Sequence, residues 1–411
     1  MRGISLATIV VAVMVLAGTA ASAGTFTTLH TFCHHGDCND GETPLGAPLI
    51  PDGQGNYLGT AEGGGVNGGG VLYTLAGGTK FKKLFDFPAA GGPLGSLIQD
   101  AQGNLYGVEE NGSTGNGAVF RLHPLNGQRT EWTYDELYDF CPRSDSCPDG
   151  TRPLALTYDG AWSGVPYDGQ SPLYGMTDYG GDKGFGTVFQ LTGNGGTWSE
   201  KVIYSICAKK GCTDGKYGGY ALVNAPNGVL YGATADGGGE KQGVVFELTP
   251  NAHRTRWTQS VVYSFCALTN CSDGSQPTGL ALDGQGGLYG LTAGGGDARL
   301  GTIFHISAEG SFTRLYSFCQ QPRCPDGAAP PMSPAIGPDG TLYGVASQVL
   351  WSYAPQTSTY SVLHTFCANG KCKDGFEPSS PLTLAADGTI FGNTFSGGND
   401  WDVGTVFSYL P

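Results

Sequence analysis

Residues 172–206 read PLYGMTDYGGDKGFGTVFQLTGNGGTWSEKVIYSI, and this stretch contains the two phrases that decide the fold. The first phrase, Leu-Tyr-Gly, stands at 105–107, 173–175, 230–232, 288–290 and 342–344, with looser copies at 57–59 and 390–392. The second phrase, Gly-Thr-Val-Phe-x-Leu or a close variant, stands at 117–122, 186–191, 243–248, 301–306 and 404–409. Seven units of about 55 residues result, and a fixed period of that length is typical of repeat folds.

Each unit reads as four short β-strands. In the unit that contains the stretch quoted above, strand A is predicted just before that stretch, at 154–160. Strand B is predicted at 172–177, strand C at 185–191 and strand D at 199–206. The runs are rich in Val, Ile, Tyr and Phe and are bounded by glycine turns, and no sustained helical periodicity follows residue 23. Four-stranded repeats in this number predict an all-β fold, a seven-bladed β-propeller, whose radial arrangement leaves the sheet edges short and protected.

The two ends of the repeat region predict how the ring closes. The first strand, at about 25–32, reads TFTTLHTF and resembles strand D, whereas the last, at about 404–410, reads GTVFSYL and resembles strand C. We expect these two strands to pair within one blade. A stack of units that never closes would need special capping repeats, and none is visible.

The first 23 residues have the features of a secretory signal peptide. A basic start at Arg2 precedes an apolar run from Ile4 to Leu16 and a small-residue end at Ala21-Ser22-Ala23. We therefore expect cleavage after Ala23, a single propeller domain at 24–411 with no membrane span, and a secreted or periplasmic location. The net charge of −14 and the absence of a basic cluster argue against nucleic-acid binding, and we expect a monomer.

Twelve cysteines form six local pairs in the connections from strand D to the next strand A. The pairs are Cys33 with Cys38, Cys141 with Cys147, Cys207 with Cys212, Cys266 with Cys271, Cys319 with Cys324 and Cys367 with Cys372. An even count and an oxidising compartment predict six structural disulfides. Zinc is the alternative, but a four-ligand site would need pairs from neighbouring blades to meet, so we expect no metal there.

An aspartate followed by glycine closes each cysteine loop. These residues are Asp40, Asp149, Asp214, Asp273, Asp326 and Asp374. A ring of carboxylates could bind calcium, which the sequence leaves open. Because the aspartate recurs in every cysteine loop, we favour a structural turn in which the carboxylate accepts backbone N–H groups before the glycine.

The units resemble the GloVer-type tandem repeat of exported bacterial proteins. The residues that carry the resemblance are Asp-Gly-x-Leu-Tyr-Gly at 339–344, Gly-Thr-Val-Phe at 186–189 and 404–407, and the run from Trp257 to Phe265. The resemblance covers nearly all of the chain after residue 23 and implies a propeller-like fold in an exported protein. It implies no activity or catalytic set, and the cysteine pairs depart from the usual pattern.

Candidate binding residues are those that interrupt the repeat in the glycine-rich connections between strands B and C. Trp401 lies between Asp400 and Asp402, and an exposed indole flanked by carboxylates could stack on a sugar ring and accept its hydroxyl groups. The alternative is a tryptophan folded onto its own blade. Tyr179 and Asp182 form a second, weaker cluster.

The sequence contains no catalytic triad, zinc-protease or phosphate-loop motif, and we expect no cofactor. The favoured interpretation is an exported, non-catalytic binding or scaffold propeller that recognises a glycan or an extracellular protein through its loop-rich rim. One alternative is a carbohydrate-active enzyme, a glycoside hydrolase or polysaccharide lyase, with an acidic site at the channel mouth. The other is a purely structural cell-surface protein.

Overall fold

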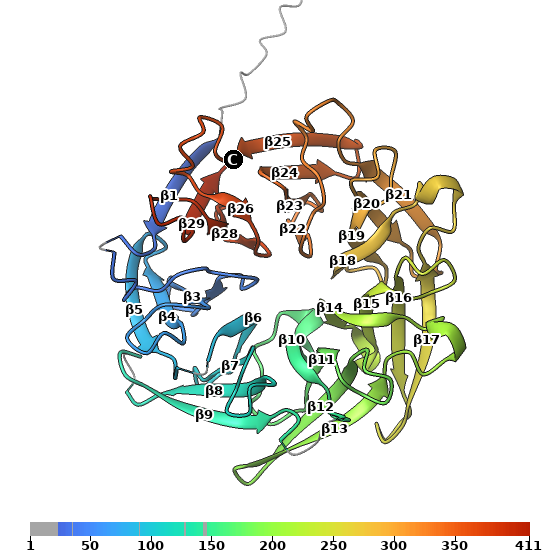
Figure 1. Ribbon diagram of the computed structural model, residues 1–411, viewed down its shortest axis with the longest axis horizontal. Coiled ribbons are helices and arrows are strands. Elements are labelled where there is room, and N and C mark those ends of the chain that lie inside the picture. Colours follow the sequence, from blue (N-terminus) through green and yellow to red (C-terminus); the bar gives the residue numbers. More distant parts are fainter. Residues whose placement is uncertain (1–23, 35, 90, 127–128, 143–145) are drawn as a thin grey trace, which may run out of the picture.

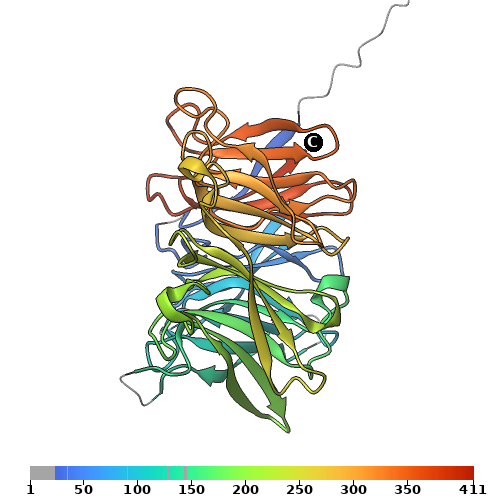
Figure 2. The ribbon, with the colours of Figure 1, turned by 90° about the vertical axis from the view of Figure 1, so that its right-hand side faces the viewer.

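The structure is a computed structural model that describes residues 24–34, 36–89, 91–126, 129–142 and 146–411. The predicted signal peptide, residues 1–23, lies outside the described residues. The described strands form seven antiparallel sheets arranged radially around one axis (Figure 1). Seen from the side, connecting loops project from both flat faces of the ring (Figure 2). The predicted all-β, seven-bladed propeller is confirmed.

Each blade has its strands in the order A to D from the axis outward. Blade 1 contains β2 (Ile50–Pro51), β3 (Tyr57–Ala61), β4 (Val71–Ala76) and β5 (Lys80–Asp86). Blade 2 contains β6 (Pro93–Gln99), β7 (Leu105–Glu109), β8 (Ala118–Pro124) and β9 (Trp132–Asp139). Blade 3 contains β10 (Thr151–Tyr158), β11 (Leu173–Tyr179), β12 (Thr187–Asn194) and β13 (Thr197–Ser205).

The remaining blades repeat this order. Blade 4 contains β14 (Lys216–Asn224), β15 (Leu230–Asp236), β16 (Val244–Pro250) and β17 (Trp257–Ser264). Blade 5 contains β18 (Ser275–Leu282), β19 (Leu288–Gly294), β20 (Thr302–Ile306) and β21 (Phe312–Ser317). Blade 6 contains β22 (Ala335–Ile336), β23 (Leu342–Ala346), β24 (Val349–Ala354) and β25 (Thr359–Thr365). Four short 3₁₀ turns lie in connections of the described chain: η1 (Ala161–Ser163), η2 (Lys210–Cys212), η3 (Pro226–Gly228) and η4 (Thr269–Cys271).

Blade 7 closes the ring with strands from both ends of the described chain. Its inner part is β26 (Phe376–Pro378), β27 (Thr383–Leu384) and β28 (Ile390–Ser396), followed by β29 (Thr405–Leu410) and β1 (Thr25–Thr31). β1 and β29 are antiparallel, with Thr25 opposite Leu410 and Thr31 opposite Thr405. The predicted pairing of the two end strands is confirmed, and the backbone ladder between them completes the circle.

The two sequence phrases recur together because they pack against each other. The glycine of Leu-Tyr-Gly lies opposite the aromatic residue of the second phrase on the neighbouring strand, as Gly175 lies opposite Phe189. A Cβ atom on Gly175 would lie only 2.2 Å from Cζ of Phe189. The same clash would occur in the other six blades, at Gly59, Gly107, Gly232, Gly290, Gly344 and Gly392. An aromatic ring therefore covers each of these glycines, and these rings are buried in the core clusters between blades.

A second glycine joins neighbouring blades. Gly117, which opens the second phrase in blade 2, has a φ of 97°, and a Cβ there would lie 2.2 Å from Cδ of Pro153 at the start of blade 3. The residue before that proline, Arg152, has a φ of 54° and donates its backbone N–H to the carbonyl of Asn116 at 2.7 Å. Equivalent N–H bonds to the preceding blade are made by Thr43, Gln276 and Ala329. These backbone hydrogen bonds hold Arg152 and its equivalents at the inner ends of their blades, next to the axis.

Candidate functional site

The six predicted disulfides are all present, in the connections from strand D to the next strand A. They join Cys33 to Cys38, Cys141 to Cys147, Cys207 to Cys212, Cys266 to Cys271, Cys319 to Cys324 and Cys367 to Cys372. Cys141 and Cys147 stand six positions apart in the sequence, whereas the cysteines of the other pairs stand five positions apart.

The cysteine loops and the B–C connections lie together on one face of the ring. In five loops the carbonyl of the second cysteine accepts an N–H from a glycine of the adjacent B–C connection. Cys147 accepts this bond from Gly181 at 2.9 Å, despite its wider spacing, and Cys372 accepts it from Gly398 at 2.7 Å. These bonds join the two sets of loops into one layer, which we call the B–C face. The opposite face, which carries the A–B turns, is called the A–B face.

Cys324 differs from the other five, although all six cysteine pairs look alike in the sequence. Its disulfide with Cys319 is present, but the B–C connection of blade 6 consists only of Ser347 and Gln348 and has no glycine to donate to the Cys324 carbonyl. That carbonyl accepts the N–H of Gly327 at 2.9 Å, within its own loop. The short connection is joined to the cysteine loop by the Ser347 hydroxyl instead, which donates to the carbonyl of Ala328 at 2.9 Å.

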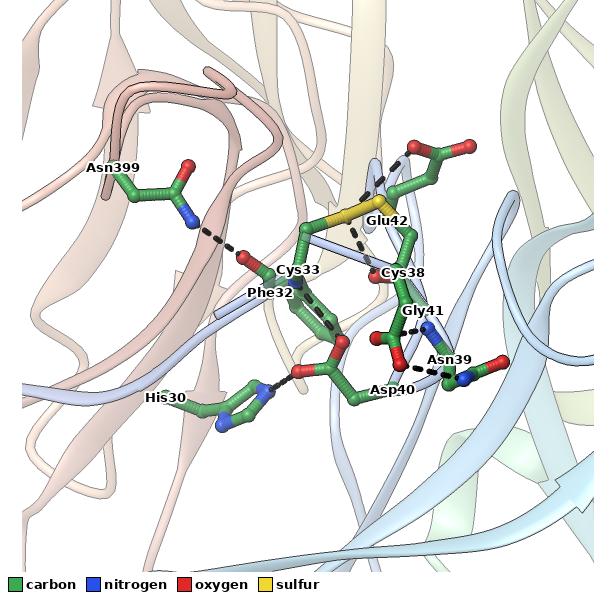
Figure 3. Close-up of polar contacts among 10 residues, drawn as sticks. His30, Phe32, Cys33, Cys38, Asn39, Asp40, Gly41, Glu42 and Asn399 are labelled. Carbon is green, nitrogen blue, oxygen red and sulfur yellow. Dashed lines mark hydrogen bonds and ion pairs between the residues drawn. A yellow bond between two sulfur atoms is a disulfide. The ribbon is translucent and has the colours of Figure 1, made fainter. Parts of the chain in front are cut away.

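The aspartates that close the cysteine loops hold each loop onto the preceding strand D, as Figure 3 shows for the first loop. In the first loop, Asp40 Oδ1 accepts the backbone N–H of Cys33 at 3.0 Å, and its Oδ2 lies 2.9 Å from Nε2 of His30. Burial alone would raise the pKa of Asp40, but the bonds from His30 and Cys33 outweigh it and lower that pKa. In the loop of Asp273, a tyrosine replaces the histidine, and Tyr263 donates its hydroxyl at 2.8 Å.

The same clamp recurs at the other aspartates, so the geometry supports a structural role for them. Tyr138, Tyr204, Tyr316 and His364 contact Asp149, Asp214, Asp326 and Asp374. The prediction that each carboxylate accepts backbone N–H groups next to the glycine was wrong. The accepted N–H groups lie five to eight residues before the aspartate, at the start of the loop, and not next to the glycine.

A metal site at the cysteines is not supported by the donors present. Among the described residues, one group of three potential ligands comes together, Cys33, Cys38 and Glu42. Both sulfur atoms of that group belong to one disulfide, so neither is available as a thiolate.

The Trp401 cluster lies in the B–C connection of blade 7. Trp401 is 63% exposed, and a Cβ on Gly36 of the first cysteine loop would lie 3.4 Å from its ring. Asp400 and Asp402 are exposed as well. Oδ1 of Asp402 already accepts the backbone N–H of Gly397 at 2.6 Å, so this carboxylate is bound to its own loop. Trp401 and Asp400 are therefore the two predicted residues of this cluster best placed to contact a ligand.

The second predicted cluster, Tyr179 and Asp182, lies in blade 3. Tyr179 is 47% exposed and stands edge-on to Tyr217 at 5.9 Å between ring centroids. Phe185 also packs on Tyr217. Asp182 is exposed, and its backbone N–H donates to the Ser205 hydroxyl at 2.8 Å. The structure places this cluster on blades 3 and 4, away from Trp401 on blade 7.

Four charged residues that the sequence analysis did not single out meet at the axis. Arg152 Nε lies 3.1 Å from Oε1 of Glu110 in blade 2, and Arg152 Nη1 lies 2.9 Å from Oδ2 of Asp178 in blade 3. Glu62 in blade 1 neighbours Glu110. Burial raises the pKa of Glu62 to about 7, Glu110 adds to that rise, and Arg152 opposes it.

The other side of the axis is less charged at the same repeat positions. A cavity of about 410 Å³ there is lined mostly by uncharged residues, among them Leu45, Ala329, Pro378 and Phe395, and by one acidic residue, Glu377. Glu377 precedes Pro378 as Arg152 precedes Pro153. We call this arrangement, the four charged residues on blades 1–3 and the largely apolar cavity on blades 6 and 7, the central basin.

A position-by-position comparison of the seven units would have revealed the basin. The third residue after the glycine of Leu-Tyr-Gly is Glu62, Glu110 or Asp178 in blades 1 to 3. In blades 4 to 7 it is Ala235, Ala293, Ser347 or Phe395. Charge is therefore confined to three neighbouring blades at a position that the fold does not require to be charged.

Comparison with known sequences identifies the repeat in the later part of the chain. Residues 255–411 match the Gloeobacter/Verrucomicrobia repeat. This segment is a Gloeobacter/Verrucomicrobia repeat region. The predicted resemblance to GloVer-type repeats is thus confirmed, whereas no curated protein matches the chain. Within the described residues of this repeat protein, no helix is long and apolar enough to cross a membrane.

Several solved structures share the fold at low sequence identity. The extracellular domain of a one-component system from B. thetaiotaomicron is 10% identical, with a TM-score of 0.57 over 94% of this chain and 40% of that chain. The extracellular domain of a hybrid two-component system from the same organism is 12% identical, with a TM-score of 0.57 over 94% of this chain and 41% of that one. An oligogalacturonate lyase in complex with manganese is 13% identical, with a TM-score of 0.56 over 95% and 97% of the two chains. The repeat protein spans about two fifths of the length of the first two, and such identities show the fold alone.

Proposed function

We propose that this repeat protein is a secreted or periplasmic binding protein that recognises a glycan or an extracellular protein at the central basin. The observation that carries the proposal is the asymmetry of the basin. Residues that break the repeat gather at one place. They are charged on blades 1–3 and mostly uncharged, apart from Glu377, on blades 6 and 7, with Tyr179 and Tyr217 beside them. A concave site with a few convergent polar groups is the usual form of a binding site. The six disulfides support an oxidising location outside the cytosol.

The geometry of the carboxyl groups supports binding over a two-carboxylate glycosidase. Such enzymes hold their acid and their base or nucleophile roughly 5–9.5 Å apart, with the sugar between them. Glu62 and Glu110 lie within hydrogen-bonding reach of each other, and Arg152 pairs with the latter. This leaves no room for a sugar ring between the two carboxyl groups.

A glycan array probed with purified residues 24–411 tests the proposal, followed by binding assays with a panel of extracellular proteins. Arg152→Ala removes the charge that links blades 2 and 3, and we expect it to abolish binding. Arg314→Ala is the matched control, because Arg314 also forms an ion pair with an aspartate but lies on outer strand β21. Binding that both variants retain would remove the basin as the site. Trp401→Ala tests the earlier candidate in the same experiment.

One observation favours a carbohydrate-active enzyme as a second candidate. A carboxyl group with a pKa near 7, as at Glu62, is suited to proton transfer at neutral pH. Incubation with bacterial and plant polysaccharides would show new reducing ends from a hydrolase, or the ultraviolet absorbance of an unsaturated uronate from a lyase. Activity that disappears in Glu62→Gln would establish this function. No product from any polysaccharide would leave binding as the function.

A further inference from the structure

Blade 3 carries an insertion on the A–B face, opposite the central basin. The connection between strands A and B has five residues in the other six blades, and in blade 3 it has fourteen, residues 159–172. This insertion contains η1 and the exposed residues Trp162 and Val165. The repeat alone does not require such a segment, so it is a candidate for a separate function.

The insertion is fixed to blades 2 and 4. Tyr167 is fully buried, and its backbone bonds to Gln99 and Ala101 of blade 2. On the other side, Asp159 forms a 2.8 Å ion pair with Arg254, and Gly160 donates its N–H to Asn224 Oδ1 at 3.1 Å. These anchors hold the tip, including Trp162, in one place before any ligand arrives.

Beside the tip lies a cavity of about 340 Å³. Its walls include Trp162, Pro226, Asn227, Tyr231 and Leu282, together with the glycine turn at 284–286. This volume is within the roughly 300–1,000 Å³ of small-ligand sites. None of the described residues that line it has a charged side chain.

Three hydrogen-bonding groups of the cavity walls have no protein partner. In the described part of the chain, the indole N–H of Trp162, the side-chain amide of Asn227 and the hydroxyl of Tyr231 make no hydrogen bond. All three residues line the cavity. Asn227 has a φ of 66°, so its backbone, too, is held in a conformation that side chains rarely adopt. The cavity therefore combines two aromatic surfaces with one amide and two further polar groups.

We propose that this cavity binds an uncharged sugar ring, such as the end residue of a neutral oligosaccharide. The apolar C–H face of a pyranose matches the half-exposed indole of Trp162, while Asn227 and Tyr231 can exchange hydrogen bonds with its hydroxyl groups. A charged sugar is disfavoured, because the walls supply no counter-charge and burying an unpaired charge is costly. This site is independent of the central basin and of the function proposed for it.

The test is isothermal titration calorimetry of purified residues 24–411 with four neutral tetrasaccharides and one acidic one. The neutral probes are those of cellulose, starch, chitin and β-1,3-glucan, and the acidic probe is tetragalacturonate. We expect at least one neutral probe to bind and the acidic probe not to. Trp162→Ala should weaken the neutral probe by about tenfold or more, because it removes the stacking surface.

Two controls separate a binding role from a structural one. Asn227→Gly keeps the positive φ, which glycine adopts readily, and removes only the amide, so it should weaken binding by about two- to tenfold without loss of stability. Arg314→Ala breaks an ion pair on outer strand β21, outside both proposed sites. It should leave the neutral probe bound. The inference is overturned if no neutral probe binds, if the acidic probe alone binds, or if Trp162→Ala binds as the unaltered protein does.

Discussion

Gly232→Ala tests whether an aromatic ring over glycine determines the blade. A Cβ at this position would lie 2.4 Å from Cζ of Phe246, about 1 Å or more inside normal contact. Phe246 is buried in the cluster between blades 3 and 4 and has little room to move. Overpacking of this kind costs about 1–3 kcal/mol. Alanine also lowers the conformational entropy of the unfolded chain, which stabilises the fold by about 0.4–1 kcal/mol. We therefore expect the free energy of unfolding to fall by about 1–2 kcal/mol in total.

The measurement is guanidinium unfolding followed by tryptophan fluorescence, with the midpoint compared at unchanged slope. Gly239→Ala is the matched control, because it lies in the same blade, has no positive φ and would place its Cβ 3.6 Å from Ser264. That variant should be as stable as the unaltered protein or slightly more stable. The double variant Gly232→Ala/Phe246→Leu should lose less unfolding free energy than the sum of the two single losses. The shorter leucine side chain leaves space for the alanine methyl group. Equal midpoints for Gly232→Ala and Gly239→Ala would refute the argument.

Three further predictions concern stability. Burial raises the pKa of Glu109 to about 7, so its contribution is complete below its unfolded value of about 4.5 and is lost as the pH rises through 7. Glu109→Gln should therefore reduce the fall in unfolding free energy between pH 5 and pH 8 by up to about 3 kcal/mol, measured by denaturant titration; an unchanged pH profile would contradict this. Replacing Cys266 and Cys271 with serine should cost roughly 2 kcal/mol in the same assay, and no loss would show that the short loop needs no disulfide. Asp273→Ala leaves the hydroxyl of Tyr263 and a loop N–H without their acceptor and should cost about 2–4 kcal/mol, so a midpoint shift below that of the disulfide variant would argue against the clamp.

The fold could be predicted from the sequence because its determinants are local and repeated. Leu-Tyr-Gly and the following aromatic phrase lie on adjacent strands, so their packing appears as a fixed spacing in every unit. Ring closure was predictable for the same reason, since 25–32 and 404–410 are the two halves of one incomplete blade. A structural role for Asp40 was predicted, but its partner His30 lies ten residues earlier, and nothing in the sequence links the two.

The central basin could not be predicted in the same way. Glu62, Glu110 and Arg152 are each more than 40 residues from the next, and each alone resembles an ordinary surface charge. Only the ring brings them together, because neighbouring blades place equivalent positions around one axis. Trp401 was predicted as a binding residue from its residue type and its two acidic neighbours. In the structure, one of these neighbours, Asp402, is already hydrogen-bonded to its own loop.

The pairing of β1 with β29 imposes an order of events on synthesis. β1 is made before the other strands of the ring and its partner β29 after them. The edge of β1 that later pairs with β29 therefore stays unpaired while about 370 further residues are added. During that interval the growing chain is exposed to wrong strand partners and benefits from a chaperone that covers the edge. A translation product that stops before Thr405 lacks the partner of β1, which makes it a natural substrate for quality-control proteases.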